Sequence, residues 1–180
     1  MRRLLTKSEW AAEIATFDHD AFHLELQPTY LVEDQAAFQR YLAGDHTPPT
    51  DDPSIRDWLA GIARQAAAGK RIERVRVFED PPTEYQRWER WFGRWNEEAG
   101  ESIRYMTRQR AHEVGLLPAA GDEDWWLLDS SRLVVTRFDA AGRAVEDELI
   151  TDPERVTQAC TWRSLAIHHS APADDRSHAS

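Results

Sequence analysis

The sequence predicts an α/β fold of the mixed (α+β) kind, with a mixed or antiparallel sheet, flanking helices and a C-terminal β-meander followed by a helix. Capped amphipathic segments alternate with runs of β-branched residues in the first part of the chain. Three strand-like runs then follow one another with only turn residues between them. Because 180 residues suit one core, residues 1–169 are expected to form a single domain. Residues 170–180, rich in Ser, Ala and Asp, are expected to be a disordered tail.

The helices are predicted from capping residues and from apolar residues at helical spacing. Thr6 and Glu9 have the spacing of a capping box, and Asp52 followed by Pro53 is typical of a helix start. The segment 108–121 is interrupted by glycine and proline, so we expect a loop with a short helix. The expected helices cover residues 6–16, 32–44, 52–69, 83–99 and 152–169.

The strands are predicted from apolar and polar side chains that alternate along the chain. In the run Arg71–Phe78, Val75 and Val77 lie on one face, and Arg74 and Arg76 lie on the other. The other strand-like runs cover residues 21–26, 101–107, 125–128, 132–138 and 143–150. Since the last three runs are joined by short turn segments, they are expected to pair as antiparallel neighbours.

Composition limits the partners and the compartment. The formal net charge of −10 repels phosphate backbones and anionic lipid surfaces, so neither direct nucleic-acid binding nor membrane binding is expected. No window approaches the ~20 apolar residues of a membrane helix, and the first residues lack the apolar run of a signal peptide. The cytoplasm is therefore the expected location. The single cysteine, Cys160, leaves no internal disulfide and no cysteine-based metal site.

Candidate metal and catalytic motifs are incomplete. His19, Asp20 and His23 form the pattern H-D-x-x-H, which on a helix would resemble a zinc-protease site. The alternating pattern around His23 favours a strand, however, and a strand would separate the two imidazoles by ~13 Å. The carboxylates of residues 122–124 lack the alternate spacing of a calcium loop. We therefore assign no catalytic residue, no metal ligand and no cofactor.

The segment 83–99 carries the most informative surface. At helical spacing it has an aromatic stripe, expected to face the core, made of Tyr85, Trp88, Phe92 and Trp95. A second stripe holds Arg87, Arg90 and Arg94, with Trp91 at the edge of the aromatic one. This arginine stripe is either a solvated face neutralised by nearby glutamates or a docking face, because Arg beside Trp is typical of interface hot spots. These four residues are our predicted interaction site.

An alternative site uses arginines of the predicted strands. Arg74, Arg76, Arg104 and Arg132 could hold an anionic ligand or a nucleotide at the strand ends, because guanidinium groups bind phosphate and carboxylate in a bidentate manner. In that case the protein would be an anion- or nucleotide-binding sensor.

Several motifs along the chain resemble those of a known family. They are Phe22-His-Leu-Glu, the Arg71–Val77 strand, Pro82-Thr-Glu-Tyr85, Gly100–Arg104, and Asp124-Trp-Trp-Leu-Leu-Asp129 followed by Arg132-Leu-Val. Together they resemble the actinobacterial family called domain of unknown function 6879, over roughly Phe22 to Ala166. The resemblance implies a gene that lies beside a helix-turn-helix regulator, so a co-encoded regulator is the expected protein partner. No reaction is established for the family, so no catalytic residue is carried over.

The order of the elements also resembles half of a phospholipase D type domain. In that superfamily a hairpin carries a His, a Lys two residues later and an Asp, because a His nucleophile and a phosphate-binding Lys must converge. Here lysine occurs only at Lys7 and Lys70, and no His has a Lys two positions after it. The resemblance therefore implies the fold without the usual phosphoryl-transfer chemistry.

These observations favour a non-enzymatic interaction protein, an accessory partner of a helix-turn-helix transcriptional regulator. One alternative is the anion-binding sensor or a phospholipase D-like enzyme relic. Another alternative is a component of a toxin–antitoxin pair, which gene pairing would reveal.

Overall fold

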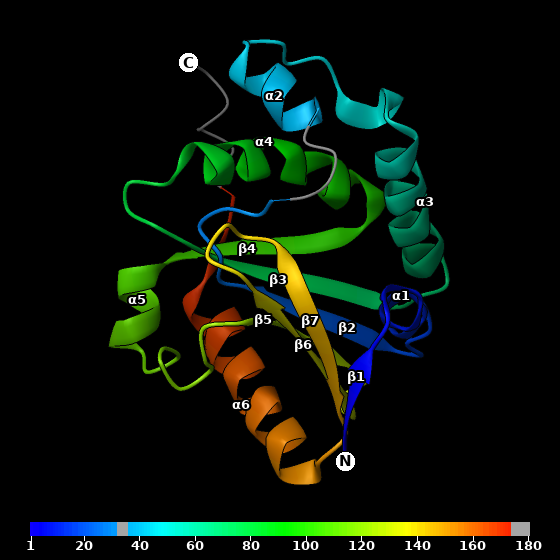
Figure 1. The fold of residues 1–180 in the computed structure, drawn as a ribbon, viewed down its shortest axis with the longest axis vertical. Helices are drawn as coiled ribbons and strands as arrows, with labels where there is room; N and C mark the ends of the chain where they lie inside the picture. The colour runs from blue at the N-terminus through cyan, green and yellow to red at the C-terminus, as the bar shows by residue number, and fades with distance from the viewer. Residues whose placement is uncertain (32–35, 174–180) are drawn as a thin grey trace.

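The computed structural model describes residues 1–31 and 36–173, which form one eight-stranded mixed sheet between layers of helices (Figure 1). The strands are β1 (Arg2–Leu5), β2 (Asp20–Glu25), β3 (Arg71–Phe78), β4 (Glu101–Thr107), β5 (Asp124–Leu128), β6 (Arg132–Phe138), β7 (Ala144–Ile150) and β8 (Ala171–Pro172). Their order is β1-β7-β6-β5-β2-β3-β4-β8. Strands β2, β3 and β4 are parallel, whereas the other neighbouring pairs are antiparallel. The predicted α/β fold is confirmed, including the meander β5–β6–β7.

Several helices begin or end at the capping residues that the sequence predicts. They are α1 (Lys7–Ala15), α2 (Ala36–Leu42), α3 (Pro53–Ala67), α4 (Glu84–Ala99), α5 (Arg108–Glu113) and α6 (Pro153–His169), with a 3₁₀ turn at Pro49–Asp51. Thr6 and Glu9 form the predicted capping box of α1. Asp52 caps α3 by accepting from Ser54 N at 2.8 Å. Gly100 ends α4 with a φ of 109°, a left-handed conformation that favours glycine.

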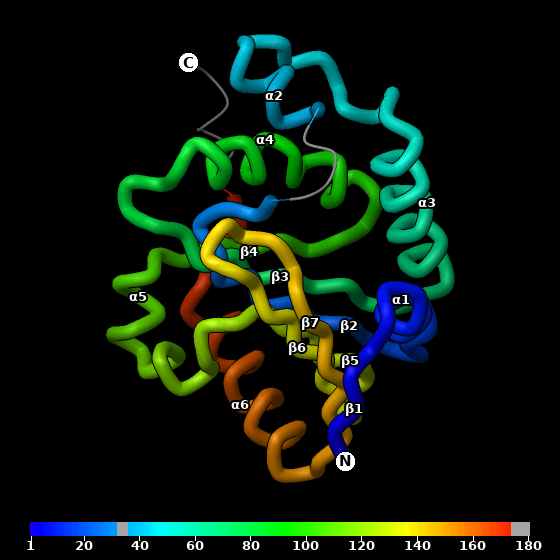
Figure 2. Tube along the Cα trace, in the orientation of Figure 1, coloured from blue at the N-terminus to red at the C-terminus, as the bar shows by residue number. Residues whose placement is uncertain are grey.

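The sequence does not predict the two edge strands. Arg2 of β1 pairs with Ile150 of β7, and Tyr105 of β4 pairs with Ala171 of β8, so both pairings join distant parts of the chain. Figure 2 shows the first residues beside the link from β7 to α6, where Thr151 N donates to the main-chain oxygen of residue 1 at 3.0 Å. The start of the predicted tail thus belongs to the sheet, while residues 174–180, like residues 32–35 of the predicted second helix, lie outside the described residues.

Alternation along the strands separates two apolar clusters. On β2, Phe22 and Leu24 face the layer of α5 and α6, in one cluster with Trp162. Ile14 of α1 and Ile62 of α3 belong to the cluster on the opposite face. In Figure 1, α5 and α6 lie below the sheet, and α3 and α4 lie above it. Within the part of the chain that is described, no helix is long and apolar enough to cross a membrane.

Helix α4 covers the sheet with a polar face. Its buried residues are Tyr85, Gln86, Glu89, Gly93 and Asn96. Trp88, Phe92 and Trp95 are only partly buried, so the prediction that their stripe faces the core is wrong. The Trp88 ring packs instead on Phe38 of α2, with a centroid distance of 5.5 Å. The reason is that the sheet beneath α4 carries charged side chains, which the polar residues of the helix can contact.

Candidate functional site

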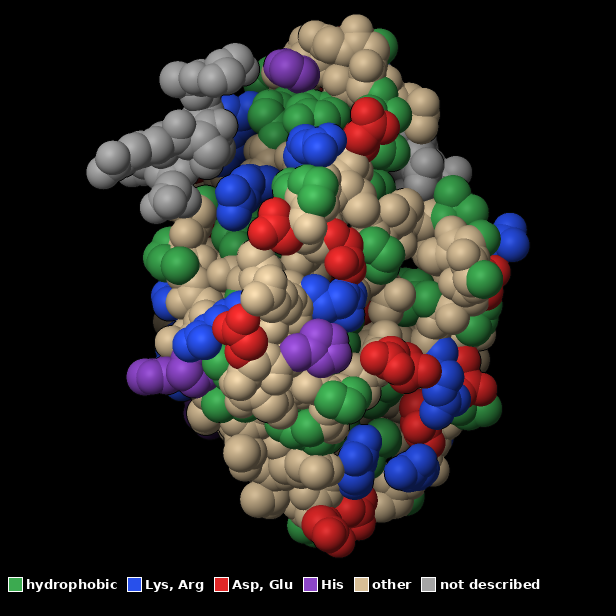
Figure 3. Space-filling view, turned by 90° about the vertical axis from the view of Figure 1, so that its left-hand side faces the viewer, with side chains coloured by type: hydrophobic (Ala, Val, Ile, Leu, Met, Phe, Trp, Pro, Cys, Tyr) green, Lys and Arg blue, Asp and Glu red, His purple; other side chains and the backbone are tan. Residues whose placement is uncertain are grey.

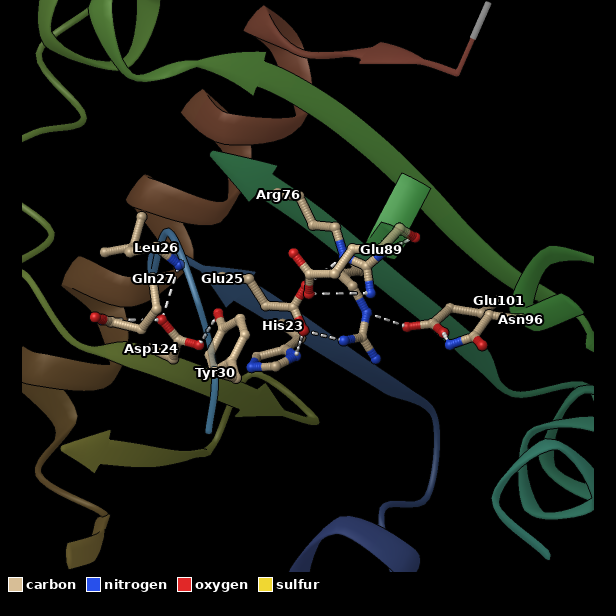
Figure 4. Close-up of polar contacts among 11 residues, drawn as sticks. His23, Glu25, Leu26, Gln27, Tyr30, Arg76, Glu89, Asn96, Glu101 and Asp124 are labelled. Atoms are coloured by element: carbon tan, nitrogen blue, oxygen red, sulfur yellow. Dashed lines mark hydrogen bonds and ion pairs between the residues drawn. The ribbon is translucent and has the colours of Figure 1, made fainter. Parts of the chain in front are cut away.

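A layer of charged and polar side chains, which we call the charged layer, is buried between the sheet and α4 (Figure 4). Each is less than 10% exposed, and the members are His23 and Glu25 of β2, Arg74 and Arg76 of β3, Glu101 of β4, Asp124 of β5, and Glu89 and Asn96 of α4. The strands place these residues on one face because side chains at alternate positions point the same way. The predicted alternation in β3, with arginines opposite valines, is confirmed by this arrangement.

Glu25 lies at the centre of this layer. It accepts hydrogen bonds from Nη1 of Arg74 and from Nε of Arg76, the latter at 2.5 Å. Arg74 Nε also donates to Glu101 at 2.7 Å, and Asn96 Nδ2 donates to the other oxygen of Glu101 at 2.6 Å. Burial opposes the ionisation of Glu25, but the two arginines outweigh it and lower the pKa of this carboxyl group below its ordinary value. The charges of Arg74 and Arg76 are therefore paired with glutamates of the same chain.

A cavity of about 470 Å³ opens beside the charged layer, and we call it the acidic cavity. It lies where β2 ends and β5 begins, under α4, and includes residues of β6 and β7. Its carboxylates are Glu25, Glu89, Asp124, Glu146 and Asp147. Its aromatic residues are Trp10, Tyr30, Tyr85, Trp126 and Phe138. The volume is that of a site for a small molecule.

Asp124 and Glu89 are the buried carboxylates of this cavity with the weakest cationic support. Asp124 accepts from Leu26 N at 2.8 Å and from the Tyr30 hydroxyl at 2.5 Å. Burial and the nearby charge of Glu25 raise the pKa of Asp124 to about 7, although these hydrogen bonds act in the opposite direction. Burial likewise raises the pKa of Glu89 to about 8. Both groups therefore carry protons over part of the neutral pH range.

His23 lines the same cavity in a neutral form. Its ring stacks on Trp126 with a centroid distance of 4.1 Å and an interplanar angle of 12°. Burial lowers the pKa of His23 to about 3, although Glu25 lies 3.5 Å from Nδ1 and favours the charged form. The predicted strand around His23 is confirmed. Lys7 also lines the cavity, but it comes from α1 and not from the same strand as His23.

The four arginines of the predicted anion site do not converge. Arg74 and Arg76 lie together in the charged layer. Arg104 donates to Ser170 Oγ at 3.0 Å, at the start of β8. Arg132 forms ion pairs with Glu13 at 2.6 Å and with Asp129 at 3.3 Å, at the other end of the sheet face. Each of the four guanidinium groups thus has a partner within the chain.

The four residues of the predicted interaction site, in contrast, line one groove. Arg87, Arg90, Trp91 and Arg94 share a hollow of about 760 Å³, which we call the arginine groove. It also includes Tyr41 and His46 near α2, Phe78 at the end of β3, and Tyr105 of β4. Figure 3 shows blue basic side chains beside green hydrophobic ones near the upper end of this side of the molecule.

The arginines of this groove contact aromatic rings, and the two carboxylates that also line the groove, Glu79 and Asp80, form no ion pair with them. The guanidinium of Arg90 lies 4.6 Å from the ring centre of Tyr105, and that of Arg94 lies 4.2 Å from Trp95. Among the described residues, none of Arg87, Arg90 and Arg94 forms an ion pair or a side-chain hydrogen bond. The Nε atoms of Arg90 and Arg94 are shielded from solvent and have no acceptor within the described part of the chain. The glutamates expected to neutralise this stripe do not reach it.

Sequence reasoning missed the acidic cavity. Its residues come from seven helices and strands, and only two patterns point toward it. One is the alternation of arginine with valine in β3. The other is the row of polar residues on α4, where Gln86, Glu89 and Asn96 follow at intervals of three and seven. The row identifies the buried face of α4 once a charged sheet is known to lie beneath it.

Comparison with known proteins identifies a family and a fold. The family model "Domain of unknown function (DUF6879)" matches residues 8–176. NucT from Helicobacter pylori superposes with a TM-score of 0.53 at 9% identity, covering 96% of this chain and 98% of that chain. The phospholipase D family member Nuc from Salmonella typhimurium gives 0.55 at 7% identity, covering 97% and 100%. At such identities the likeness shows the fold alone. No curated protein sequence matches this chain.

Proposed function

Since the chain belongs to the family described as domain of unknown function 6879, we propose that it is a non-enzymatic interaction protein with a phospholipase D-like fold. In this proposal an acidic segment of a protein partner docks in the arginine groove. The partner to test first is the helix-turn-helix regulator that the family resemblance implies.

The observation that carries the proposal is the lack of acidic partners for three clustered arginines. The chain has 32 acidic and 22 basic residues, so carboxylates are abundant. Arg87, Arg90 and Arg94 nevertheless form no ion pair among the described residues, and two of them are half-buried. Shielding a charged group without a counter-ion is unfavourable, and carboxylates of a bound partner would remove that cost. Trp91 and Tyr41 add the aromatic area that is enriched at interface centres.

A protein segment fits this groove better than a nucleic acid does. The net charge of −10 repels a long polyanion that extends beyond the groove. A short acidic segment contacts only the groove, where the three arginines outnumber Glu79 and Asp80, and its apolar side chains can pack on the aromatic rings. Charge complementarity therefore favours an acidic and partly apolar peptide.

The fold likeness does not supply catalysis here. The β5–β6 hairpin carries Asp124 and Trp126 two residues apart, and not a His followed by a Lys. The cavity beside this hairpin is lined by five carboxylates, which disfavour a phosphate group. A phospholipase D-like enzyme relic remains the second candidate, because the fold is shared.

The test compares two triple variants that change the net charge equally. The test variant replaces Arg87, Arg90 and Arg94 with Ser. The control variant replaces the exposed arginines Arg40, Arg56 and Arg64 with Ser. Each removes three positive charges, which changes the formal net charge from −10 to −13. Binding is measured by capture of the co-encoded regulator and by the fluorescence anisotropy of a labelled peptide of alternating Glu and Leu.

We expect the test variant to bind both probes at least about ten-fold more weakly and the control variant to bind like the wild type. Wild-type binding should weaken with added salt, because the contacts are electrostatic. The thermal unfolding of both variants should stay near that of the wild type. Equal binding by the two variants would contradict the proposal. So would a preference for duplex DNA or for phosphatidylglycerol vesicles over the acidic peptide.

A further inference from the structure

The acidic cavity has no part in the docking proposed above, yet its walls have the chemistry of a ligand site. We propose that it binds a small organic ammonium ion, held between its carboxylates and its aromatic rings.

Among the described residues that line the cavity, five carry carboxyl groups, and the basic side chains are Lys7 and the neutral His23. Of its five carboxylates, Glu25 pairs with two arginines and Glu146 pairs with Arg137. Asp124 and Asp147 form no ion pair among the described residues. An ammonium ion would supply the missing positive charge where the low-dielectric surroundings strengthen the attraction.

Glu89 is the carboxylate of the cavity that most clearly lacks hydrogen-bond donors and a close cation. It is 5% exposed and lines the cavity, yet its carboxylate accepts no hydrogen bond within the described chain. Its nearest cation is Nη2 of Arg76, at 3.8 Å, which is beyond hydrogen-bond distance. Buried carboxylates normally have several hydrogen-bond donors. A bound ammonium group would donate the hydrogen bonds that this carboxylate lacks.

The aromatic residues form the second part of the site. Tyr30 lies with its ring centre 5.3 Å from Phe138 and 5.8 Å from Tyr85, and the ring planes differ by 71° and 55°. Trp126 adds a fourth ring to the cavity. Rings inclined to one another around a small cavity are typical of cages for organic cations, which interact with the π-electrons.

A metal ion fits the cavity less well. In the described part of the chain, no group of three or more His, Cys, Asp and Glu side chains is placed to hold one. The aromatic walls also offer few oxygen ligands to a hydrated divalent cation. An organic cation uses both the carboxylates and the rings, which explains why they occur together.

Binding should also release protons. The charged groups around Glu89 are Glu25 on β2, Arg74 and Arg76 on β3, and Asp124 on β5. Burial raises the pKa of Glu89 and of Asp124, so both carry protons over part of the neutral range in the free protein. A cation in the cavity favours their charged forms, and the protons leave as it binds.

The experiment uses ligands that share one butyl chain and differ in charge. Butylammonium and trimethylbutylammonium are titrated into the full chain by isothermal calorimetry, with butan-1-ol as the neutral ligand and butyrate as the anionic one. We expect both cations to bind more tightly than butan-1-ol, and butyrate not to bind. The apparent heat at neutral pH should depend on the ionisation heat of the buffer, which reports proton release.

A pair of variants on α4 completes the test. Glu89→Gln keeps the shape of the side chain and removes its charge, so it should weaken cation binding by about ten-fold or more. Glu84→Gln removes an exposed charge from the same helix and should leave binding unchanged. Neither variant should alter peptide binding in the arginine groove, so failure here is distinct from failure of the docking proposal. Equal affinity for butan-1-ol, a preference for butyrate or Mg²⁺, or full affinity of Glu89→Gln would overturn the inference.

Discussion

Arg76 of β3 holds helix α4 on the sheet by donating a hydrogen bond from Nη1 to the main-chain oxygen of Glu89, at 2.7 Å. The same guanidinium donates from Nε to Glu25 on β2. One buried side chain thus joins two strands and a helix. Gly93, one turn beyond Glu89, lets the helix approach the sheet, since a Cβ atom there would lie 3.0 Å from Oη of Tyr105 and 3.3 Å from Cδ1 of Ile103.

Arg76→Met should therefore lower the free energy of unfolding by about 3 kcal/mol or more, because Glu25 loses a buried counter-ion. Arg71→Met is the control on the same strand. Its side chain is 70% exposed and pairs with Asp20 at 3.1 Å, so its removal should cost less than about 1 kcal/mol. Denaturant titration of both variants measures the difference, and similar losses would contradict a structural role for the buried pair.

Stability should fall as the pH rises from 6.5 to 8. The pKa of Asp124 is raised from 3.8 to about 7 and that of Glu89 from 4.5 to about 8, so the folded chain binds protons that the unfolded chain has lost. Their stabilisation is complete below the unfolded values and is lost as the pH passes the folded ones. His23 acts in the opposite direction, but its pKa is lowered from 6.5 to about 3, so its effect is complete above pH 6.5.

The variant Glu89→Gln should reduce this loss of stability between pH 6.5 and 8, because it removes one of the two titrating groups. Glu84→Gln, at an exposed position of the same helix, should leave the pH profile as in the wild type. Denaturation midpoints measured across this range test the assignment. An unchanged profile for Glu89→Gln would show that another group is responsible.

Two glycine substitutions should have opposite effects. At Gly100, φ is 109° and an added Cβ would lie 2.6 Å from Cβ of Ala66, so Gly100→Ala should destabilise the fold by more than about 1 kcal/mol. Gly61 lies inside α3, and an added Cβ would meet only Arg64, at 3.8 Å. Gly61→Ala should stabilise by about 0.5–1 kcal/mol through helix propensity. Thermal unfolding of both variants measures the sign, and two shifts in the same direction would contradict the packing described for Gly100.

The protein should not hydrolyse phosphodiesters such as bis-p-nitrophenyl phosphate. The chain has no His followed by a Lys at the spacing of the phospholipase D motif, and five carboxylates line the cavity beside the corresponding hairpin. The assay compares the wild type with His23→Asn. Hydrolysis that disappears in this variant would favour the enzyme relic over an interaction protein.

Sequence patterns predicted most of the secondary structure because these signals are local. The boundaries of β3, β4 and β6 agree with the predicted runs, and α3 and α6 begin at Pro53 and Pro153, directly after a capping Asp. The four interaction residues were also identified from helical spacing, which places them on one side of α4. Their docking role stays a prediction.

The sequence by itself determined the alternation of apolar and charged residues in the strands, the helix caps and the lack of the phospholipase D motif. Only the tertiary structure decided which side of α4 is buried. Aromatic side chains are the usual core residues, but the helix lies over Glu25, Arg74 and Glu101, whose charges require polar neighbours. The edge strands and the acidic cavity were decided in the same way. Each depends on contacts between residues distant in the chain, which no local pattern records.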